Sequence, residues 1–155
     1  MGIFNLFKTK KAEKIPPEKI QNHNITGVSH YQDNILKLAK KDPLYDLSKK
    51  EIIAKKIDGY IYQYKFKPQK TELLPEPDNP HDPNAIKVII DGQHVGYIKA
   101  GSCTRILKLI KEDHIARIES KIGGGNYKMY WNDGISMNVE KGKNNFNVRI
   151  SIIEK

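Results

Sequence analysis

Apolar and polar residues alternate with a period of two along several segments of the chain, which is the pattern of half-buried β-strands. Glycine-containing turns such as Asp91-Gly92 and Asn132-Asp133-Gly134 separate these segments. Many short strands joined in this way predict a mostly-β barrel with helical additions. The strands are expected at residues 25–31, 60–67, 70–74, 85–90, 93–98, 115–122, 127–131 and 146–152.

Two or three short helices are expected beside the strands, where apolar residues recur at helical spacing. One spans residues 32–41, and another spans residues 103–113 with Ser102 as a candidate N-cap. A third follows Ser48-Lys49-Lys50-Glu51, which matches a capping box. Residues 123–126 and 141–145 are polar or glycine-rich and are expected to form turns.

The polar segment Glu76-Pro77-Asp78-Asn79-Pro80-His81-Asp82-Pro83-Asn84 precedes the predicted hairpin of residues 85–98. Its three prolines exclude a helix, because each fixes its own φ and keeps the preceding residue extended. Its Asp and Asn side chains can bond their own backbone and build a rigid double turn. Turn formation alone explains Asp78, Asn79 and Asn84 better than it explains the pair His81-Asp82, which is expected to be exposed at the rim of the sheet.

The residues from Glu76 to Val88, together with Val95-Gly96-Tyr97-Ile98, resemble the signature of the HIRAN domain family. The resemblance is long and gapless, and it is expected to run from Asn24 to the C-terminus with an inserted helical segment near residues 42–67. It implies a mostly-β, α+β fold, a small barrel of OB-like or SH3-like type. HIRAN domains occur fused to helicase-like and nuclease proteins and also alone, and a well-studied member binds the 3′ end of single-stranded DNA.

The same resemblance implies roles for individual residues. Asp82 matches an aspartate that receives the terminal 3′-hydroxyl, and a carboxylate there would repel a phosphate. Ser29-His30 replaces an arginine-tyrosine pair, so a lysine is expected to supply the missing phosphate contact. The residues implied to contact DNA are Asp82, His81, Tyr97, Tyr31, His30, Lys99, Lys87 and Tyr127, the last in a poorly aligned loop where Tyr130 is the alternative.

Residues 60–67 place four aromatic side chains on one face of a predicted strand, those of Tyr60, Tyr62, Tyr64 and Phe66. Two interpretations are open. The aromatic face packs in the core with its hydroxyls at the rim, or it forms a platform on which bases stack beside lysines.

Charge adds to this picture, because 27 Lys and Arg residues against 18 Asp and Glu residues give a formal net charge of +9. Such a surplus favours polyanionic partners, nucleic acid first and an anionic membrane surface second. The alternative is a solubilising lysine surface. Most of the charge is lysine, which suits diffuse phosphate attraction better than base reading.

Cys103 is the only cysteine, which excludes an intrachain disulfide and fits a cytoplasmic location. The histidines show no metal-ligand spacing, and no cofactor is expected. No apolar run approaches the roughly 18 residues of a membrane span. Residues 1–22, with an apolar tip, several lysines and Pro16-Pro17, are expected to form a flexible basic tail ahead of a domain at 23–155.

No catalytic set stands out, so the chain is not expected to be an enzyme. The expected function is a DNA-binding module that recognises single-stranded 3′ ends during repair, replication or recombination, with helicase or nuclease partners. One alternative is a protein-interaction or membrane-surface adaptor that uses the apolar tip. Another is a metal-dependent nuclease built on Asp78, His81, Asp82 and Asp91, although these residues also suit turns.

Overall fold

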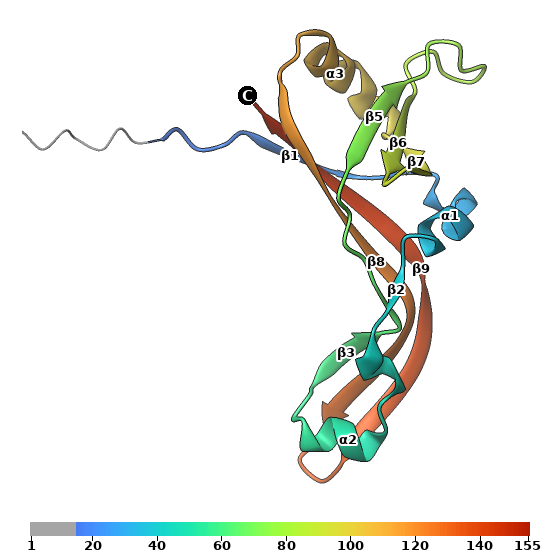
Figure 1. Ribbon diagram of the computed structural model, residues 1–155, viewed down its shortest axis with the longest axis vertical. Helices are drawn as coiled ribbons and strands as arrows, with labels where there is room; N and C mark the ends of the chain where they lie inside the picture. The colour runs from blue at the N-terminus through green and yellow to red at the C-terminus, as the bar shows by residue number, and fades with distance from the viewer. Residues whose placement is uncertain (1–14) are drawn as a thin grey trace, which may run out of the picture.

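A computed structural model describes residues 15–155 of the chain (Figure 1). The first half contains β1 (Ile20–Asn24), the 3-10 helix η2 (Val28–His30), α1 (Gln32–Leu36), β2 (Lys40–Lys41), the 3-10 helix η3 (Pro43–Asp46), α2 (Lys49–Ala54), β3 (Gly59–Tyr62) and β4 (Tyr64–Lys65). The second half contains β5 (Thr71–Pro75), β6 (Ile86–Ile90), β7 (Gln93–Tyr97), α3 (Ala100–Lys111), β8 (Ile115–Asn132) and β9 (Met137–Glu154).

The expectation of a mostly-β, α+β fold with short helices is confirmed. The described strands form three sheets, with orders β1-β9-β8-β3, β5-β6-β7 and β2-β4. These sheets do not close into one continuous barrel within residues 15–155. The side chains of Thr71 in β5 and Ser120 in β8 are joined by a hydrogen bond of 2.8 Å, which ties the two larger sheets together.

A long antiparallel hairpin of β8 and β9 runs through the whole molecule. At one end it packs with β1, α3 and the β5-β6-β7 sheet, which together form the body (Figure 1). At the other end the hairpin carries η3, α2 and β3, and we call this end, residues 42–62 and 126–144, the arm (Figure 1). The predicted inserted segment at residues 42–67 corresponds to η3, α2, β3 and β4.

Each end of the hairpin has its own core. The body buries isoleucine and valine from β6, β7, α3 and β9, including Ile86, Val88, Ile106 and Ile150, all with no exposed surface. Burial of each such side chain contributes about 1.5–3 kcal/mol. The arm buries a smaller cluster of Ile52, Ile61 and Tyr130. The capping box is confirmed at the start of α2, where Ser48 Oγ accepts a hydrogen bond of 3.2 Å from Glu51 N.

Several predicted boundaries were wrong at the N-terminal side. Residues 25–31 are not a strand: Gly27 adopts a left-handed φ of 72°, and η2 begins directly after it. The first strand is β1, which pairs with β9, so the predicted tail boundary at residue 22 falls inside a strand. The predicted helix at 32–41 ends at Leu36, because Lys40 and Lys41 pair with β4.

The predicted strand at 60–67 is interrupted at Gln63. Its N–H still donates to Asn126 O at 2.8 Å in the register of β3 and β8, but its carbonyl accepts from Asp42 N at 2.9 Å, and β4 then pairs with β2. Helix α3, which was predicted at residues 103–113, begins at Ala100. Lys99 occupies its N-cap position without a side-chain cap, so the prediction of Ser102 as N-cap was wrong.

Glycines 123–125 were predicted to form a turn that ends a strand. They lie instead inside β8, at a bulge opposite residues 144–147. Gly124 has a φ of 94°, and a Cβ there would lie 2.2 Å from the carbonyl oxygen of Asn145. The glycines therefore permit a close approach between two continuous strands. Residues 141–145 likewise belong to β9 and are not a loop. Within the described part of the chain, every helix is too short or too polar to cross a membrane.

Candidate DNA-binding site

The proline-rich loop between β5 and β6 is shaped by its own polar side chains, as the sequence predicted. Asn79 Oδ1 accepts hydrogen bonds from the backbone N–H of His81 at 2.9 Å and of Asp82 at 3.1 Å. Asp82 Oδ1 then accepts from the N–H of Asn84 at 2.8 Å. These two Asx-type turns shape the loop, and the backbone hydrogen bond of 2.9 Å from Glu76 N to Ala85 O closes its base next to the paired ends of β5 and β6.

The segment between β1 and α1 lies beside the proline-rich loop because an isolated antiparallel bridge joins Thr26 to Tyr97 of β7. Each residue donates its backbone N–H to the other's carbonyl at 2.9 Å. The bridge requires glycine at position 96, because a Cβ there would lie 2.5 Å from the carbonyl oxygen of Thr26 and 2.6 Å from Ile25 Cγ2. This close approach places Tyr31, between η2 and α1, next to β7.

The proline-rich loop and the segment bridged to Tyr97 border an open pocket of about 420 Å³, which we call the loop pocket. Four of the predicted site residues, Tyr31, His81, Asp82 and Tyr97, line it. The remaining lining residues are Thr26, Asn79, Ala85, Ile98 and Ala100. Residues far apart in the sequence thus converge on one hollow, as the predicted site requires.

Sequence reasoning missed His94, which lies between two of these aromatic rings. Its ring centroid is 4.0 Å from that of Tyr31 and 4.9 Å from that of Tyr97. Strict alternation would place residues 94 and 97 on opposite faces of β7. A bulge at Val95, which has no partner in β6 while Gly96 pairs with Val88 and His94 with Ile89, brings both side chains to one face.

The HIRAN domain family matches residues 51–140 of this 155-residue chain. The chain belongs to the HIRAN domain family. The HIRAN domain is a DNA-binding module, so membership supports nucleic-acid binding in general. The match is shorter than the expected extent from Asn24 to the C-terminus; it includes His81, Asp82 and Tyr97 of the loop pocket but not Tyr31. No curated protein and no solved structure matches the chain.

The charge state of the HIRAN loop pocket follows from burial and from one carboxylate at its edge. Burial, with a contribution from Glu76, raises the pKa of Tyr97, so its phenol stays protonated and can donate a hydrogen bond. The hydrogen bond from Tyr97 lowers the pKa of Glu76, which is therefore ionised at neutral pH. Burial lowers the pKa of His94, so its imidazole is neutral there.

Asp82 has one carboxylate oxygen engaged and one available. Oδ1 caps the turn at Asn84, whereas Oδ2 accepts no hydrogen bond from any side chain or backbone group of residues 15–155. The side chain is half-buried beside Tyr97 and Ala100. A carboxylate in this position accepts hydrogen bonds and cannot donate them.

Positive charge lies next to the loop pocket at the start of α3. Ala100, the first residue of this 12-residue helix, lines the pocket, and exposed Lys99 precedes it. The N-terminus of a helix carries a partial positive charge and unpaired N–H groups that favour anions. Lys87 pairs with Tyr97 across the sheet and lowers the pKa of Glu76, but it does not line the pocket.

Two predicted site residues lie elsewhere. His30 ends η2, is exposed, and is not among the residues that line the loop pocket. Tyr127 lies on the arm, where β8 pairs with β3 and Tyr127 faces Tyr62. Tyr127 and Tyr130 do not lie on a loop, because residues 115–132 form one continuous strand. Tyr130, the alternative, is buried in the arm core.

The carboxylates considered for a metal site serve the loop and hairpin. Asp91 accepts backbone hydrogen bonds from Gln69 at 3.1 Å and Lys70 at 2.7 Å, at the opposite end of β6 from Asp82. Among residues 15–155, no group of three or more His, Cys, Asp or Glu side chains is arranged to hold a metal ion.

Proposed function

We propose that this HIRAN protein binds single-stranded DNA without catalysis and holds a 3′-hydroxyl end in the loop pocket. The observation that carries the proposal is the half-buried Asp82 carboxylate, which lines the pocket with Oδ2 unengaged by residues 15–155. A terminal hydroxyl can donate a charge-assisted hydrogen bond to that oxygen, whereas a terminal phosphate would bring a second negative charge to it.

The aromatic residues around Asp82 support binding of the terminal nucleotide. Tyr31 and Tyr97 offer large apolar rings with polar edges, and the protonated Tyr97 phenol can donate to a base or sugar. His81 is exposed at the rim and can stack on a base with less area than a tyrosine. Such contacts tolerate every base, which fits binding to ends of any sequence.

Phosphate attraction in this proposal comes from the start of α3 and from lysine. Ala100 at the first turn of α3 lines the pocket; Lys99 does not line it but directly precedes Ala100 and is exposed, so the N–H groups of this turn and the Lys99 ammonium would meet the phosphate that precedes the terminal sugar. They take the place of the arginine that the family resemblance implies and that Ser29 replaces. The physiological setting we infer is repair, replication-fork or recombination DNA, together with helicase or nuclease proteins.

A fluorescence titration tests the proposal. Two single strands of one sequence, one ending in a 3′-hydroxyl and one in a 3′-phosphate, are titrated over a range of salt concentrations, with and without magnesium. We expect tighter binding of the hydroxyl strand and a linear fall of log affinity with log salt. Equal or tighter binding of the phosphate strand would refute end recognition, and magnesium-dependent cleavage would establish the nuclease alternative.

The adaptor alternative depends on the apolar tip of the chain. Residues 1–7 and the lysines that follow lie outside the described residues. Residues 15–155 therefore supply no observation specific to this alternative, whereas the DNA proposal is supported by the loop pocket and by membership of the HIRAN family.

A further inference from the structure

The arm carries a group of tyrosines on the outer face of its sheet. Tyr60 and Tyr62 of β3 lie with ring centroids 6.0 Å apart and an interplanar angle of 15°. Tyr127 of β8 lies 5.3 Å from the first ring and 6.0 Å from the second. We call these three side chains the tyrosine cluster.

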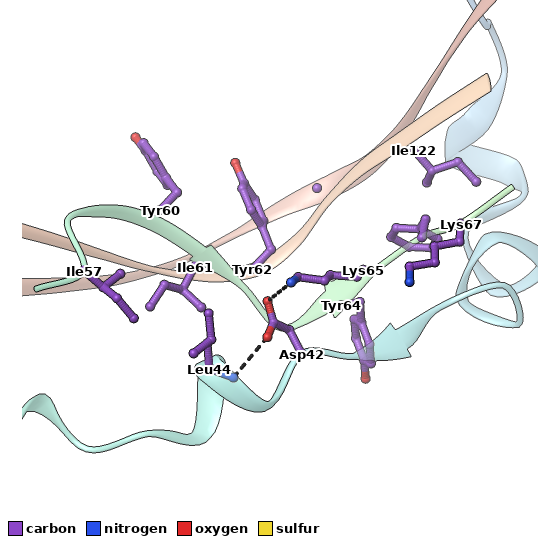
Figure 2. A pocket seen from close by; sticks show the side chains of 12 residues that line it. Asp42, Leu44, Ile57, Tyr60, Ile61, Tyr62, Tyr64, Lys65, Lys67 and Ile122 are labelled. Carbon is purple, nitrogen blue, oxygen red and sulfur yellow. Dashed lines mark hydrogen bonds and ion pairs between the residues drawn. The ribbon is translucent and has the colours of Figure 1, made fainter. Parts of the chain in front are cut away.

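The tyrosine cluster is not part of the arm core. Ile61, between the two tyrosines of β3, and Tyr130 of β8 point to the opposite face, where they pack against Ile52 of α2. The alternation of β3 therefore separates a covered apolar face from an uncovered aromatic one. Tyr60 remains 57% exposed, and Figure 2 shows Tyr60 and Tyr62 projecting to the same side while Tyr64 points the other way.

The neighbouring strand leaves room for the third ring. Gly142 of β9 pairs with Tyr127, and a Cβ at position 142 would lie 2.3 Å from the Tyr127 hydroxyl oxygen. The ring therefore lies across the backbone of β9. A residue with a side chain at position 142 would have to push the ring off this surface. Glycine at position 142 therefore allows the Tyr127 ring to lie against β9.

A groove of about 500 Å³ adjoins the cluster and is lined by Tyr60, Tyr62, Lys65 and Lys67 among others (Figure 2). Its one carboxylate, Asp42, is only 6% exposed, and it accepts from Leu44 N at 3.0 Å and pairs with the Lys65 ammonium at 3.3 Å. Residues 40–67 contain eight lysines and four acidic residues. This segment therefore carries a net positive charge, and Lys65 and Lys67 bring part of it to the groove beside Tyr60 and Tyr62.

We propose that the tyrosine cluster and the adjoining groove form a second binding surface for single-stranded DNA, on which bases from within a strand stack on the tyrosines while Lys65 and Lys67 attract the phosphates. Exposed aromatic rings beside lysines are the combination that binds single strands without reading their sequence. The choice of single-stranded DNA as the ligand rests on the proposed function. Unlike the loop pocket, this surface needs no strand end.

A circular single strand separates the two surfaces, because it has no end to enter the loop pocket. The test measures the affinity of the full chain for a circular single-stranded DNA by fluorescence anisotropy. The variant Tyr60→Ala/Tyr127→Ala removes two stacking rings from exposed or half-exposed positions. We expect at least a fivefold loss of affinity, since each base stacked on an aromatic side chain contributes on the order of 1–3 kcal/mol.

Matched variants identify the cause of that loss. Tyr60→Phe keeps the ring and should bind the circle as the parent does. Ile135→Ala alters a residue that is 94% exposed at the tip of the same arm and should also bind normally. Glu140→Gln removes an exposed negative charge that shares the face of Tyr60, through the pairing of both residues with Met129, and should strengthen binding.

The outcomes separate this proposal from end recognition. If the parent chain fails to bind the circle, or if the double tyrosine variant binds it as well as the parent does, the arm surface is refuted whatever happens at 3′ ends. If circle binding depends on the tyrosines but 3′-hydroxyl and 3′-phosphate strands bind alike, the arm surface stands and end recognition falls. Weakening by Tyr60→Phe as large as that by alanine would also refute stacking.

Discussion

Asp82→Asn tests the loop pocket most directly, because it separates two functions of the carboxylate: the turn hydrogen bond made by Oδ1 and the proposed hydrogen bond from a 3′-hydroxyl to Oδ2. The Asn side chain keeps an oxygen that can accept from Asn84 N, as Oδ1 now does at 2.8 Å. It replaces the unengaged Oδ2 with an NH₂ group, which donates and carries no negative charge. The turn is preserved while the acceptor for a terminal hydroxyl is lost.

The expected magnitudes differ for the two functions. The turn hydrogen bond contributes about 0.5–1.5 kcal/mol to folding, and Asn retains it, so the melting temperature should change little. The charge-assisted bond to a 3′-hydroxyl contributes about 1.5–3 kcal/mol, which corresponds to a roughly 10- to 150-fold loss of affinity. Repulsion of a terminal phosphate also disappears, so the affinity for 3′-phosphorylated strands should rise.

The assay pairs binding with stability. The parent chain, Asp82→Asn and Asp82→Ala are titrated with both strand types, and their thermal unfolding is followed by circular dichroism. Asp82→Ala should lose both the end preference and part of the turn's stability. Asp78→Asn is the matched control, because Asp78 is an exposed carboxylate of the same loop and should leave both readouts unchanged.

End recognition by Asp82 is wrong if Asp82→Asn retains the parental ratio of affinities for the two strand types. A variant that melts early and still discriminates the ends would show that the carboxylate only shapes the turn before Pro83. A loss of affinity that is equal for both strand types would point to a change in the pocket's shape, and the measured melting temperature would reveal it.

Two further predictions concern how the pocket and the sheet are held. Gly96→Ala should destabilise the fold by about 1–3 kcal/mol and weaken end binding, because its Cβ would collide with the backbone at Thr26; an unchanged melting temperature would contradict the role given to the bridge. Deletion of residues 1–18 should leave the sheet intact, whereas deletion of residues 1–24 removes β1 and its pairing with β9 and should lower the melting temperature by several degrees; equal melting of both truncated chains would show that β1 contributes nothing.

The parts of the fold that sequence predicted best were those specified by local chemistry. Asp91-Gly92 forms the hairpin turn with φ values of 46° and 81°, the left-handed pair that such a turn needs. The capping box at Ser48 marks the start of α2. Glycines 123–125 misled the prediction because glycine serves a sharp turn and a close strand approach equally well. Only the partner strand, residues 144–147, decides between the two.

The site shows the same division between local and long-range information. The signature from Glu76 to Tyr97 supplied His81, Asp82 and Tyr97, because one loop and one hairpin hold them. Period-two reasoning could not place His94, because the bulge at Val95 depends on pairing with β6. Sequence reasoning could not separate Tyr127 from the loop pocket, because only the pairing of β8 with β3 and β9 shows that Tyr127 lies on the arm, where it faces Tyr62.

Affinity and end preference in this protein should have different physical origins, and the salt titration can separate them. The net charge of +9 comes mostly from lysines, whose attraction for DNA phosphates is screened and falls steeply with salt. The preference for a hydroxyl end comes from one half-buried carboxylate within about 4 Å of the end, where repulsion of a phosphate amounts to about 1–4 kcal/mol and is screened far less. Plots of log affinity against log salt for the two strand types should therefore both descend and stay nearly parallel. Lines that converge at moderate salt would mean that the preference is produced by the lysine surface and not by Asp82.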